Sequence, residues 1–188
     1  MKKGDLMKKD DHWLDSWVND ITDRSVLELG AGSGIDTQSL ARMTDQLIAG
    51  DLNPRHASVT HLDHREPLPF ENDKFDVVVA SLTLHYFEWR LTVNIVNEIQ
   101  RVLKSEGLLI CRVNSIQDIH YGAVGYPEIE TRLFQVKEQL KRFFTRDDIV
   151  KLFSDGWTLT KLTEKQIDRY DKVKTVWEFG GVNTKPSA

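Results

Sequence analysis

The sequence predicts a doubly wound α/β fold, in which helices cover both faces of a mostly parallel sheet. Short β-branched or apolar runs alternate with stretches of helical periodicity, as βαβ units require. The strongest run, residues 75–80, is apolar almost throughout, which is expected of a strand buried on both faces. A glycine-rich turn at residues 30–34 joins an apolar run to a helical stretch. These observations predict one α/β domain over residues 1–188.

The first element is a helix over residues 10–21, where Trp13, Trp17 and Ile21 share one helical face. This helix either packs on the sheet edge or, as residues 8–21, also covers a ligand pocket as a lid. Strands are expected at 26–29, 46–51, 59–62, 75–80, 107–113, 157–163 and 174–182, and helices at 35–42, at 88–103 and from 145 onward. Thr145 and Asp148 resemble a capping box. Because the last two strands have no helical pattern between them, they predict a hairpin with an antiparallel strand.

Residues 114–144 fit none of these patterns. Long connections are uncommon in compact domains unless they are functional. This one follows a sheet strand, at the edge where open α/β sheets bind ligands. It carries His120, Tyr121 and Tyr126. We therefore expect a substrate-recognition segment here.

Composition excludes several classes of protein. With 188 residues, the chain is long enough for one well-packed domain. No apolar run approaches the roughly 18 residues of a membrane span, and no apolar segment follows the first lysines as in a secretory signal. The single cysteine, Cys111, forms no internal disulfide, so a cytoplasmic location is the default. A net charge of −4 disfavours nucleic acid as a partner. We expect a monomer or a homodimer that binds no membrane.

The glycine turn favours one class of ligand over another. Gly30, Gly32 and Gly34 let the backbone approach a ligand closely, and the helix that follows offers free N–H groups. A dinucleotide fingerprint, Gly-x-Gly-x-x-Gly, requires its third glycine at position 35, where this chain has isoleucine. The chain instead has an acid, Glu28, two residues before the first glycine.

Further polar residues follow the next strands. Asp51 ends the second strand about 20 residues past the loop, where a carboxylate accepts hydrogen bonds from both ribose hydroxyls. Leu52 beside it can pack on an adenine face. Asp63 ends the third strand and can accept from the adenine amino group, with the His64 backbone N–H on a ring nitrogen. The carbonyl of Ser81 can meet an ammonium group. Each acid also has a structural alternative, as a cap of the loop, of a helix or of a turn.

The order of these motifs resembles that of the class I S-adenosylmethionine (SAM)-dependent methyltransferases. The motifs are Glu28-x-Gly30-x-Gly32-x-Gly34, Asp51, Asp63, the run 75–86 and the turn 101–107, which lacks the second glycine of the family pattern. Residues 142–145 and the pair Gly156-Trp157 resemble the small-molecule branch called methyltransferase type 11 or 25.

The resemblance implies a Rossmann-like seven-stranded sheet of order 3-2-1-4-5-7-6 with strand 7 antiparallel. It also implies SAM as cofactor, S-adenosylhomocysteine as product, and methyl transfer to a small molecule by in-line displacement. The family's cofactor contacts carry over onto Glu28, Gly30, Gly32, Asp51, Asp63 and Ser81.

Catalytic residues are less clearly marked. His85 and Tyr86 follow the fourth strand at the mouth of the expected pocket, although a lone histidine there is more often a satisfied polar residue than a base. The histidines 56, 61 and 64 lack recognised metal-ligand spacing, so no metal is expected. We expect the acceptor to enter between the helix that carries Trp13 and Trp17 and the segment 114–144.

The sequence disfavours two classes of methyl acceptor and leaves two other functions open. Amino-group methylation in this fold uses an Asp/Asn-Pro-Pro-Tyr/Phe motif, where this chain has Ser-Leu-Thr-Leu at 81–84. A pyrimidine C5 methyltransferase needs a cysteine nucleophile, and Cys111 lies inside a predicted strand. Two alternatives stay open: an NAD(P)-dependent oxidoreductase, disfavoured by Ile35, and a SAM-binding regulatory protein without catalytic activity.

Overall fold

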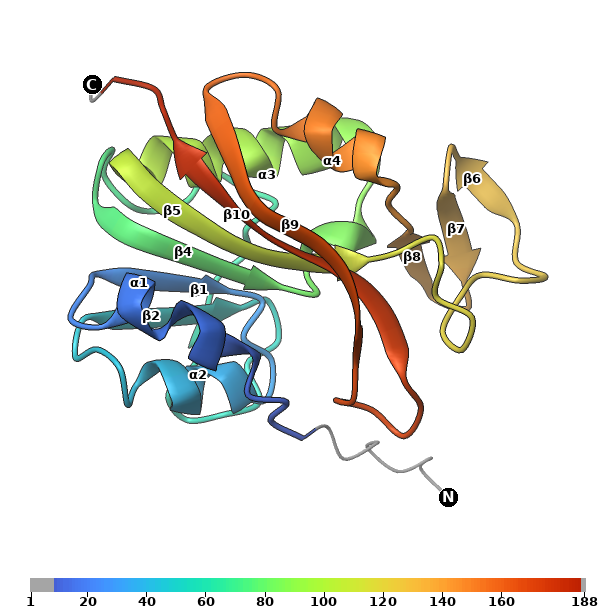
Figure 1. The fold of residues 1–188 in the computed structure, drawn as a ribbon, viewed down its shortest axis with the longest axis horizontal. Coiled ribbons are helices and arrows are strands. Elements are labelled where there is room, and N and C mark those ends of the chain that lie inside the picture. Colours follow the sequence, from blue (N-terminus) through green and yellow to red (C-terminus); the bar gives the residue numbers. More distant parts are fainter. Residues whose placement is uncertain (1–8, 187–188) are drawn as a thin grey trace.

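A seven-stranded sheet forms the centre of the molecule (Figure 1). The computed structural model describes residues 9–186. The strand order is β3-β2-β1-β4-β5-β10-β9, and only the pairings of β10 are antiparallel. The strands are β1 (Val26–Leu29), β2 (Leu47–Asp51), β3 (Thr60–His61), β4 (Phe75–Ser81), β5 (Leu103–Asn114), β9 (Trp157–Ile167) and β10 (Lys174–Asn183). The predicted order, the closing hairpin and its antiparallel strand are confirmed.

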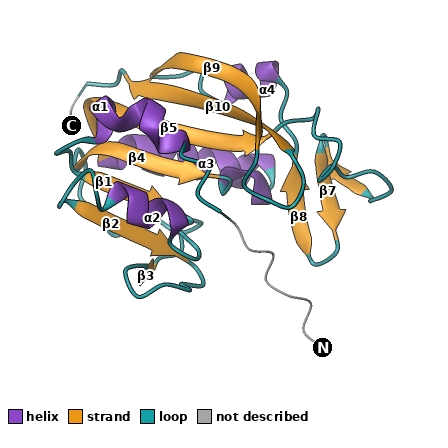
Figure 2. Cartoon of the chain, turned by 60° about the horizontal axis from the view of Figure 1, so that its bottom comes forward, coloured by secondary structure: helices purple, strands orange, loops and turns teal. Residues whose placement is uncertain are grey.

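Helices cover both faces of this sheet (Figure 2). One face carries α3 (Trp89–Val102) and α4 (Arg146–Leu152). The other carries a 3₁₀ helix, η1 (Trp13–Trp17), followed by α1 (Val18–Ile21) and α2 (Ile35–Leu40). A second 3₁₀ turn, η2 (Leu84–Tyr86), follows β4. The capping box at Thr145 is present and opens α4, as predicted.

The two faces explain why β4 lacks hydrophobic alternation. Val78 and Ala80 pack in the cluster beneath α3 and α4, whereas Val77 and Val79 pack in the cluster beneath η1 and α2. All four side chains are at most 2% exposed. A central strand with helices on both sides must be apolar on both faces.

The N-terminal segment differs from its prediction. The expected lid begins at residue 8, which lies outside the described residues, and the part from residue 9 onward is not one continuous helix. Residues 9–12 are irregular and lead into the 3₁₀ helix and a single turn of α-helix. His12 has a φ of 54°, which interrupts helical geometry before Trp13. We call residues 9–13 the strap.

The segment 114–144 holds a small antiparallel sheet that the sequence patterns do not reveal. Its strands are β6 (Glu128–Glu130), β7 (Leu133–Val136) and β8 (Gln139–Arg142). The two turns between them place Arg132 and Lys137 at positive φ, 57° and 56°. Turns of this kind usually carry glycine or asparagine at such positions. Because these turns have arginine and lysine there, the sequence does not indicate them.

Arg142 anchors this small sheet to the main body. Its Nη2 donates to the Phe87 carbonyl, which follows η2, and its Nη1 donates to the Thr131 carbonyl. Within residues 9–186, no helix has the length and apolar character needed to cross a membrane.

Candidate active site

The glycine turn between β1 and α2 has the geometry that its sequence predicts. Gly30, Gly32 and Gly34 all have positive φ, between 54° and 76°. A Cβ at Gly30 would come within 2.4 Å of the Thr83 hydroxyl, and one at Gly34 within 2.7 Å of the His56 ring. These two positions therefore require glycine both for backbone conformation and for space.

Asp51, at the end of β2, lies against this turn. Its Oδ2 accepts a hydrogen bond from the Gly32 N–H at 2.8 Å, and its Oδ1 accepts from the Asn53 N–H at 2.7 Å. A carboxylate has about four lone-pair positions, so these two bonds leave room for further donors. Leu52 follows and is half-buried. The two features that the sequence predicts to converge, the acid and the turn, are in direct contact.

Glu28 lies beneath the turn, and its residue is only 3% exposed. Its Oε2 accepts a hydrogen bond from the Thr37 hydroxyl at 2.6 Å. Burial raises the pKa of Glu28 to about 8, and the nearby charges of Asp36 and Asp51 act in the same direction. Glu28 is therefore largely protonated at neutral pH.

Asp63 and His64 follow β3. Both Asp63 oxygens are held by the Arg65 side chain, at 2.6 and 2.8 Å, and this pairing lowers the pKa of Asp63 to about 2. His64 is buried, with Nε2 3.4 Å from the Thr83 hydroxyl and its ring edge-on to Phe87. Burial lowers the pKa of His64, which favours its neutral form.

Ser81, at the end of β4, touches a buried arginine that sequence reasoning missed. Its Oγ accepts from Nε of Arg112 at 3.0 Å. Arg112 is fully buried on β5, its Nη1 donates to Asp11 at 2.6 Å, and its guanidinium lies 4.0 Å from the Trp13 ring centroid. The Ser81 side chain is thereby joined through one guanidinium to the strap.

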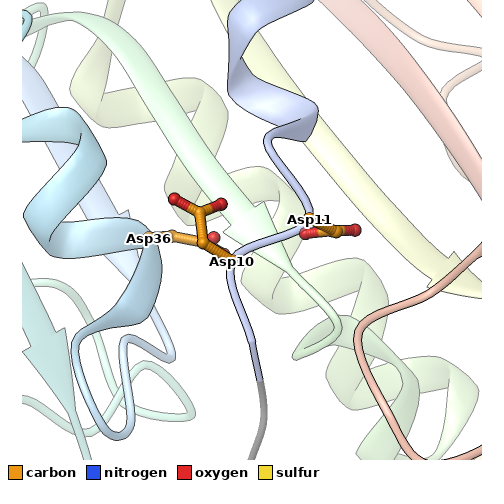
Figure 3. A group of neighbouring side chains, drawn as sticks. All are labelled: Asp10, Asp11 and Asp36. Atoms are coloured by element: carbon orange, nitrogen blue, oxygen red, sulfur yellow. The ribbon is translucent and has the colours of Figure 1, made fainter.

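A second arginine binds the strap to α2. Nη1 of Arg169, from the β9–β10 connection, lies 3.0 Å from Asp11 and 2.8 Å from Asp36. The Trp13 indole also donates to Asp36, at 3.1 Å. Figure 3 shows Asp11 and Asp36 with Asp10, which accepts from the Ser39 hydroxyl. One carboxylate oxygen from each of these three acids lies within 4.8 Å of the other two, a set that could hold a metal ion by residue type. Here the Arg169 guanidinium bridges two of them.

His85 and Tyr86 differ in exposure. His85 is buried, and its Nδ1 accepts from the Asn114 N–H at 3.3 Å. Tyr86 packs edge-on against this ring at 4.4 Å and is partly exposed. Burial of the Tyr86 hydroxyl, with the charge of Asp51, raises its pKa. Tyr86 therefore keeps its phenolic proton at neutral pH.

Tyr121 meets a tyrosine from the far end of the chain. The ring centroids of Tyr121 and Tyr170 are 5.5 Å apart, and the Lys174 ammonium lies 5.2 and 5.9 Å from them. Burial raises the pKa of Tyr170 to about 12. Tyr121 and Tyr170 form an aromatic pair with the Lys174 ammonium close to both rings.

The remaining predicted pocket residues lie in different surroundings. His120 is exposed and Tyr126 half-buried in the segment before β6. Trp17 is 2% exposed in the core cluster beneath η1, where its indole donates to Glu178 at 3.3 Å. Of the predicted pocket residues, Trp13 contacts Arg112 and Asp36, and Tyr121 contacts Tyr170.

Two cavities border the site. One, of about 340 Å³, lies outside α2 and is lined by Thr37 and His56 among others. The other, of about 380 Å³, lies between the strap and the end of β9 and is lined by Asp11, Trp13, Lys165 and Glu178 among others. Neither is lined by Asp51.

Arg112, Arg169 and Tyr170 are the site residues that sequence reasoning missed. Arg112 interrupts an apolar strand, and a charge inside a buried strand is the signal that could have found it. Arg169 and Tyr170 lie in a hairpin connection, where polar and aromatic residues carry no distinctive pattern.

Residues 27–111 match the family model described as "Methyltransferase domain". The matched region runs from β1 to β5 and includes the glycine turn, Asp51, Asp63 and Ser81. This match bears out the predicted resemblance to methyltransferases. No curated relative matches the sequence.

Solved structures of SAM-dependent methyltransferases share the fold of this chain. A SAM-dependent methyltransferase from Methanosarcina mazei superposes with a TM-score of 0.73 at 17% identity, covering 86% of this chain and 92% of the other. The 1,6-didemethyltoxoflavin-N1-methyltransferase of Burkholderia thailandensis, solved with 1,6-didemethyltoxoflavin and S-adenosylhomocysteine, gives 0.71 at 17% identity and coverage of 93% and 76%. A SAM-dependent methyltransferase from Mesorhizobium loti gives 0.63 at 13% identity and coverage of 92% and 98%. At these identities the likeness establishes the fold.

Proposed function

We propose that this chain transfers a methyl group from SAM to a small-molecule acceptor. The observation that carries the proposal is the hydrogen bond between Asp51 and the Gly32 N–H, which brings a diol-binding acid onto the glycine turn. The family match over residues 27–111 supports methyl transfer as the reaction.

The residues around the turn fit this cofactor. Asp51 keeps lone pairs for the two ribose hydroxyls after its bonds to Gly32 and Asn53. The Ser81 carbonyl, at the end of β4, would face the methionyl ammonium. Glu28 holds the turn from below through Thr37, in its neutral form. Asp63, already paired with Arg65, would use its remaining lone pairs for the adenine amino group.

When bound, SAM supplies an electrophilic methyl group whose carbon–sulfur bond breaks as the acceptor atom bonds to carbon, with the electron pair left on sulfur. The chain's own contribution is chiefly to align the acceptor with that group, since proximity and orientation dominate such displacements. The aromatic pair of Tyr121 and Tyr170, together with the exposed Tyr86 after β4, would hold the acceptor.

The protonation states of these tyrosines limit their chemistry. Tyr86 and Tyr170 have raised pKa values, so they donate hydrogen bonds at neutral pH and do not act as bases. His85 uses Nδ1 to accept from the Asn114 N–H, which assigns the proton of its neutral ring to Nε2. We assign His85 and Tyr86 a positioning role, and a proton lost by the acceptor passes to solvent.

The strap would act as the lid. It is fixed by the ion pairs of Asp11 with Arg112 and Arg169, and by the hydrogen bond from Trp13 to Asp36. The Burkholderia enzyme, which holds the small molecule 1,6-didemethyltoxoflavin together with S-adenosylhomocysteine, supports a small acceptor as the substrate class.

The test is calorimetric titration of S-adenosylhomocysteine into the wild type, Asp51→Ala and a control, Asp171→Ala, whose residue is exposed. Loss of the ribose acceptor should weaken binding at least tenfold, about 1.4 kcal/mol or more, because charge-assisted hydrogen bonds carry that range. Asp171→Ala should bind as the wild type does.

Equal affinity in the wild type and Asp51→Ala would refute the ribose assignment. Binding of NADH in place of S-adenosylhomocysteine would favour the oxidoreductase alternative. Tight S-adenosylhomocysteine binding without product formation across a panel of small acceptors would favour a regulatory role.

A further inference from the structure

Gly32 differs from the other two glycines of the turn in what lies beside it. A Cβ on Gly32 would lie 3.4 Å from Nη2 of Arg55 and 3.9 Å from Oδ2 of Asp51, the nearest atoms outside the residues next to Gly32 in the chain. These are ordinary contact distances, whereas a Cβ at Gly30 or Gly34 would overlap a neighbouring side chain. The space beside Gly32 therefore borders the ends of two side chains of opposite charge.

This space belongs to the proposed ribose site. Oδ2 of Asp51 accepts from the Gly32 N–H at 2.8 Å, and the proposed function gives the remaining lone pairs of this carboxylate to the ribose hydroxyls. Glycine lets a ligand come close to the backbone. A ligand that contacts both the turn and Asp51 thus has to use the space beside Gly32, where the Arg55 guanidinium lies.

The backbone of Arg55 is held in place, but its side chain has room to move. The Arg55 N–H donates to the Gly32 carbonyl at 3.1 Å. The chain between Asp51 and Arg55 is restrained by the bond from the Asn53 N–H to Oδ1 of Asp51 and by Pro54, whose ring fixes φ. Arg55 is exposed, and exposed side chains change rotamer within nanoseconds. The guanidinium can therefore leave the turn while the backbone stays.

We propose that the Arg55 guanidinium is a displaceable cover of the ribose site, which lies beside Asp51 in the conformation seen here and moves aside when the cofactor binds. The positive charge of Arg55 is attracted to the Asp51 carboxylate, and this attraction competes with the ribose hydroxyls. The inference rests on the proposed function, because it describes how access to that same site is controlled.

Charge argues against a permanent contact between Arg55 and the bound cofactor. A guanidinium binds best to carboxylates and phosphates, whereas a ribose diol is neutral. Once the diol occupies Asp51, Arg55 exchanges a charged neighbour for a neutral one. The arginine therefore opposes cofactor binding by the strength of its attraction to Asp51.

The test is calorimetric titration of S-adenosylhomocysteine into the wild type, Arg55→Ala and a control, Arg90→Ala. Arg55→Ala keeps the backbone N–H that donates to Gly32 and should bind about two- to fivefold more tightly, the range expected for losing an exposed ion pair. Arg55→Lys keeps the charge and should stay close to the wild type. Arg90 is exposed on α3, across the sheet from α2, so Arg90→Ala makes the same charge change elsewhere and should bind as the wild type does.

Salt provides a second measurement. S-adenosylhomocysteine carries one positive and one negative charge at neutral pH, so screening acts chiefly on the protein's own charges. The Debye length falls from about 30 Å at about 10 mM salt to about 3 Å at about 1 M. The difference in affinity between the wild type and Arg55→Ala should therefore be largest at low salt and shrink at high salt.

Normal binding by the wild type together with equal or weaker binding by Arg55→Ala would overturn the inference and leave the proposed function in place. Failure of all these proteins to bind S-adenosylhomocysteine would instead refute the proposed function, and the cover with it. Should Arg55→Ala fail to fold, Arg55→Gln, which keeps most of the side chain without its charge, gives the same comparison.

Discussion

At the scale of single residues, Glu28 has a protonation state set by its burial. Its carboxyl group lies under the glycine turn, near Asp36 and Asp51, and only the Thr37 hydroxyl donates to it in the described contacts. Because the Glu28 carboxyl group is neutral, it does not repel the carboxylates of Asp36 and Asp51. It can also act as a hydrogen-bond donor toward the turn.

This predicts a pH dependence of stability. The pKa of Glu28 rises from 4.5 to about 8 on folding. Below pH 4.5 both states hold the proton, so its favourable contribution is complete. Between pH 4.5 and 8 only the native state keeps it, and the free energy of unfolding falls by up to about 1.4 kcal/mol per pH unit. Glu28→Gln removes this dependence, so its urea midpoint should change less than that of the wild type between pH 5 and 8. Parallel curves for the two proteins would contradict the assignment.

At the scale of elements, the strap is held by buried charges and not by regular structure. Arg169 supplies the positive charge between Asp11 and Asp36, and all three side chains are at most 9% exposed. Removing one partner from a buried ion pair leaves an uncompensated charge, which costs about 3–5 kcal/mol. The strap should therefore depend on a residue far from it in sequence.

We predict that Arg169→Met lowers the free energy of unfolding by about 3 kcal/mol and speeds hydrogen exchange in residues 9–17. Urea denaturation and exchange mass spectrometry measure the two effects. The control is Lys9→Gln, because the Lys9–Asp168 pair has side chains 58% and 73% exposed and should contribute less than about 1 kcal/mol. If both variants change exchange equally, the buried network does not hold the strap.

The start of α4 offers a second test at this scale. Thr145 accepts from the Asp148 N–H, and the Asp148 carboxylate accepts from the Thr145 N–H. Thr145→Ala should lower stability by about 1 kcal/mol, whereas Thr145→Ser keeps the cap and should stay close to the wild type. Thermal unfolding of the three proteins checks this, and equal losses for alanine and serine would rule out the cap as the cause.

At the scale of the whole molecule, Cys111 reports on global unfolding. It is fully buried in β5, between β4 and β10, and burial raises the pKa of its thiol. Since only the thiolate reacts, labelling by a disulfide reagent should require opening of the central sheet. We expect native labelling at least about 1,000-fold slower than in urea, because a typical domain unfolds rarely. Rapid labelling of the native protein would mean that β5 opens locally.

The arrangement of the inner part of the main sheet follows from the sequence because β1, β2 and β4 are short, largely apolar runs. The run 75–80 and the glycine turn suffice to place β1, β2 and β4 around the candidate cofactor site. The small sheet β6–β8 could not be predicted, since its turns use Arg132 and Lys137 where glycine or asparagine is usual.

The acceptor side of the site was also only partly predictable. Trp13 and Tyr121 were expected near the pocket, but their partners Arg112, Arg169 and Tyr170 are brought there by tertiary structure. Asp11 and Arg169 are 158 positions apart. No local pattern in the sequence relates two residues at that separation.

That separation has a consequence for synthesis on the ribosome. Asp11 leaves the exit tunnel early, but its partner Arg169 is translated 158 codons later. The Arg112 side chain, also bound to Asp11, is made 101 codons after it. Residues 9–13 must therefore stay undocked until nearly all of the chain up to Arg169 has emerged. A nascent chain stalled before Arg169 should remain open to protease near its beginning, and release of the finished chain should close that site.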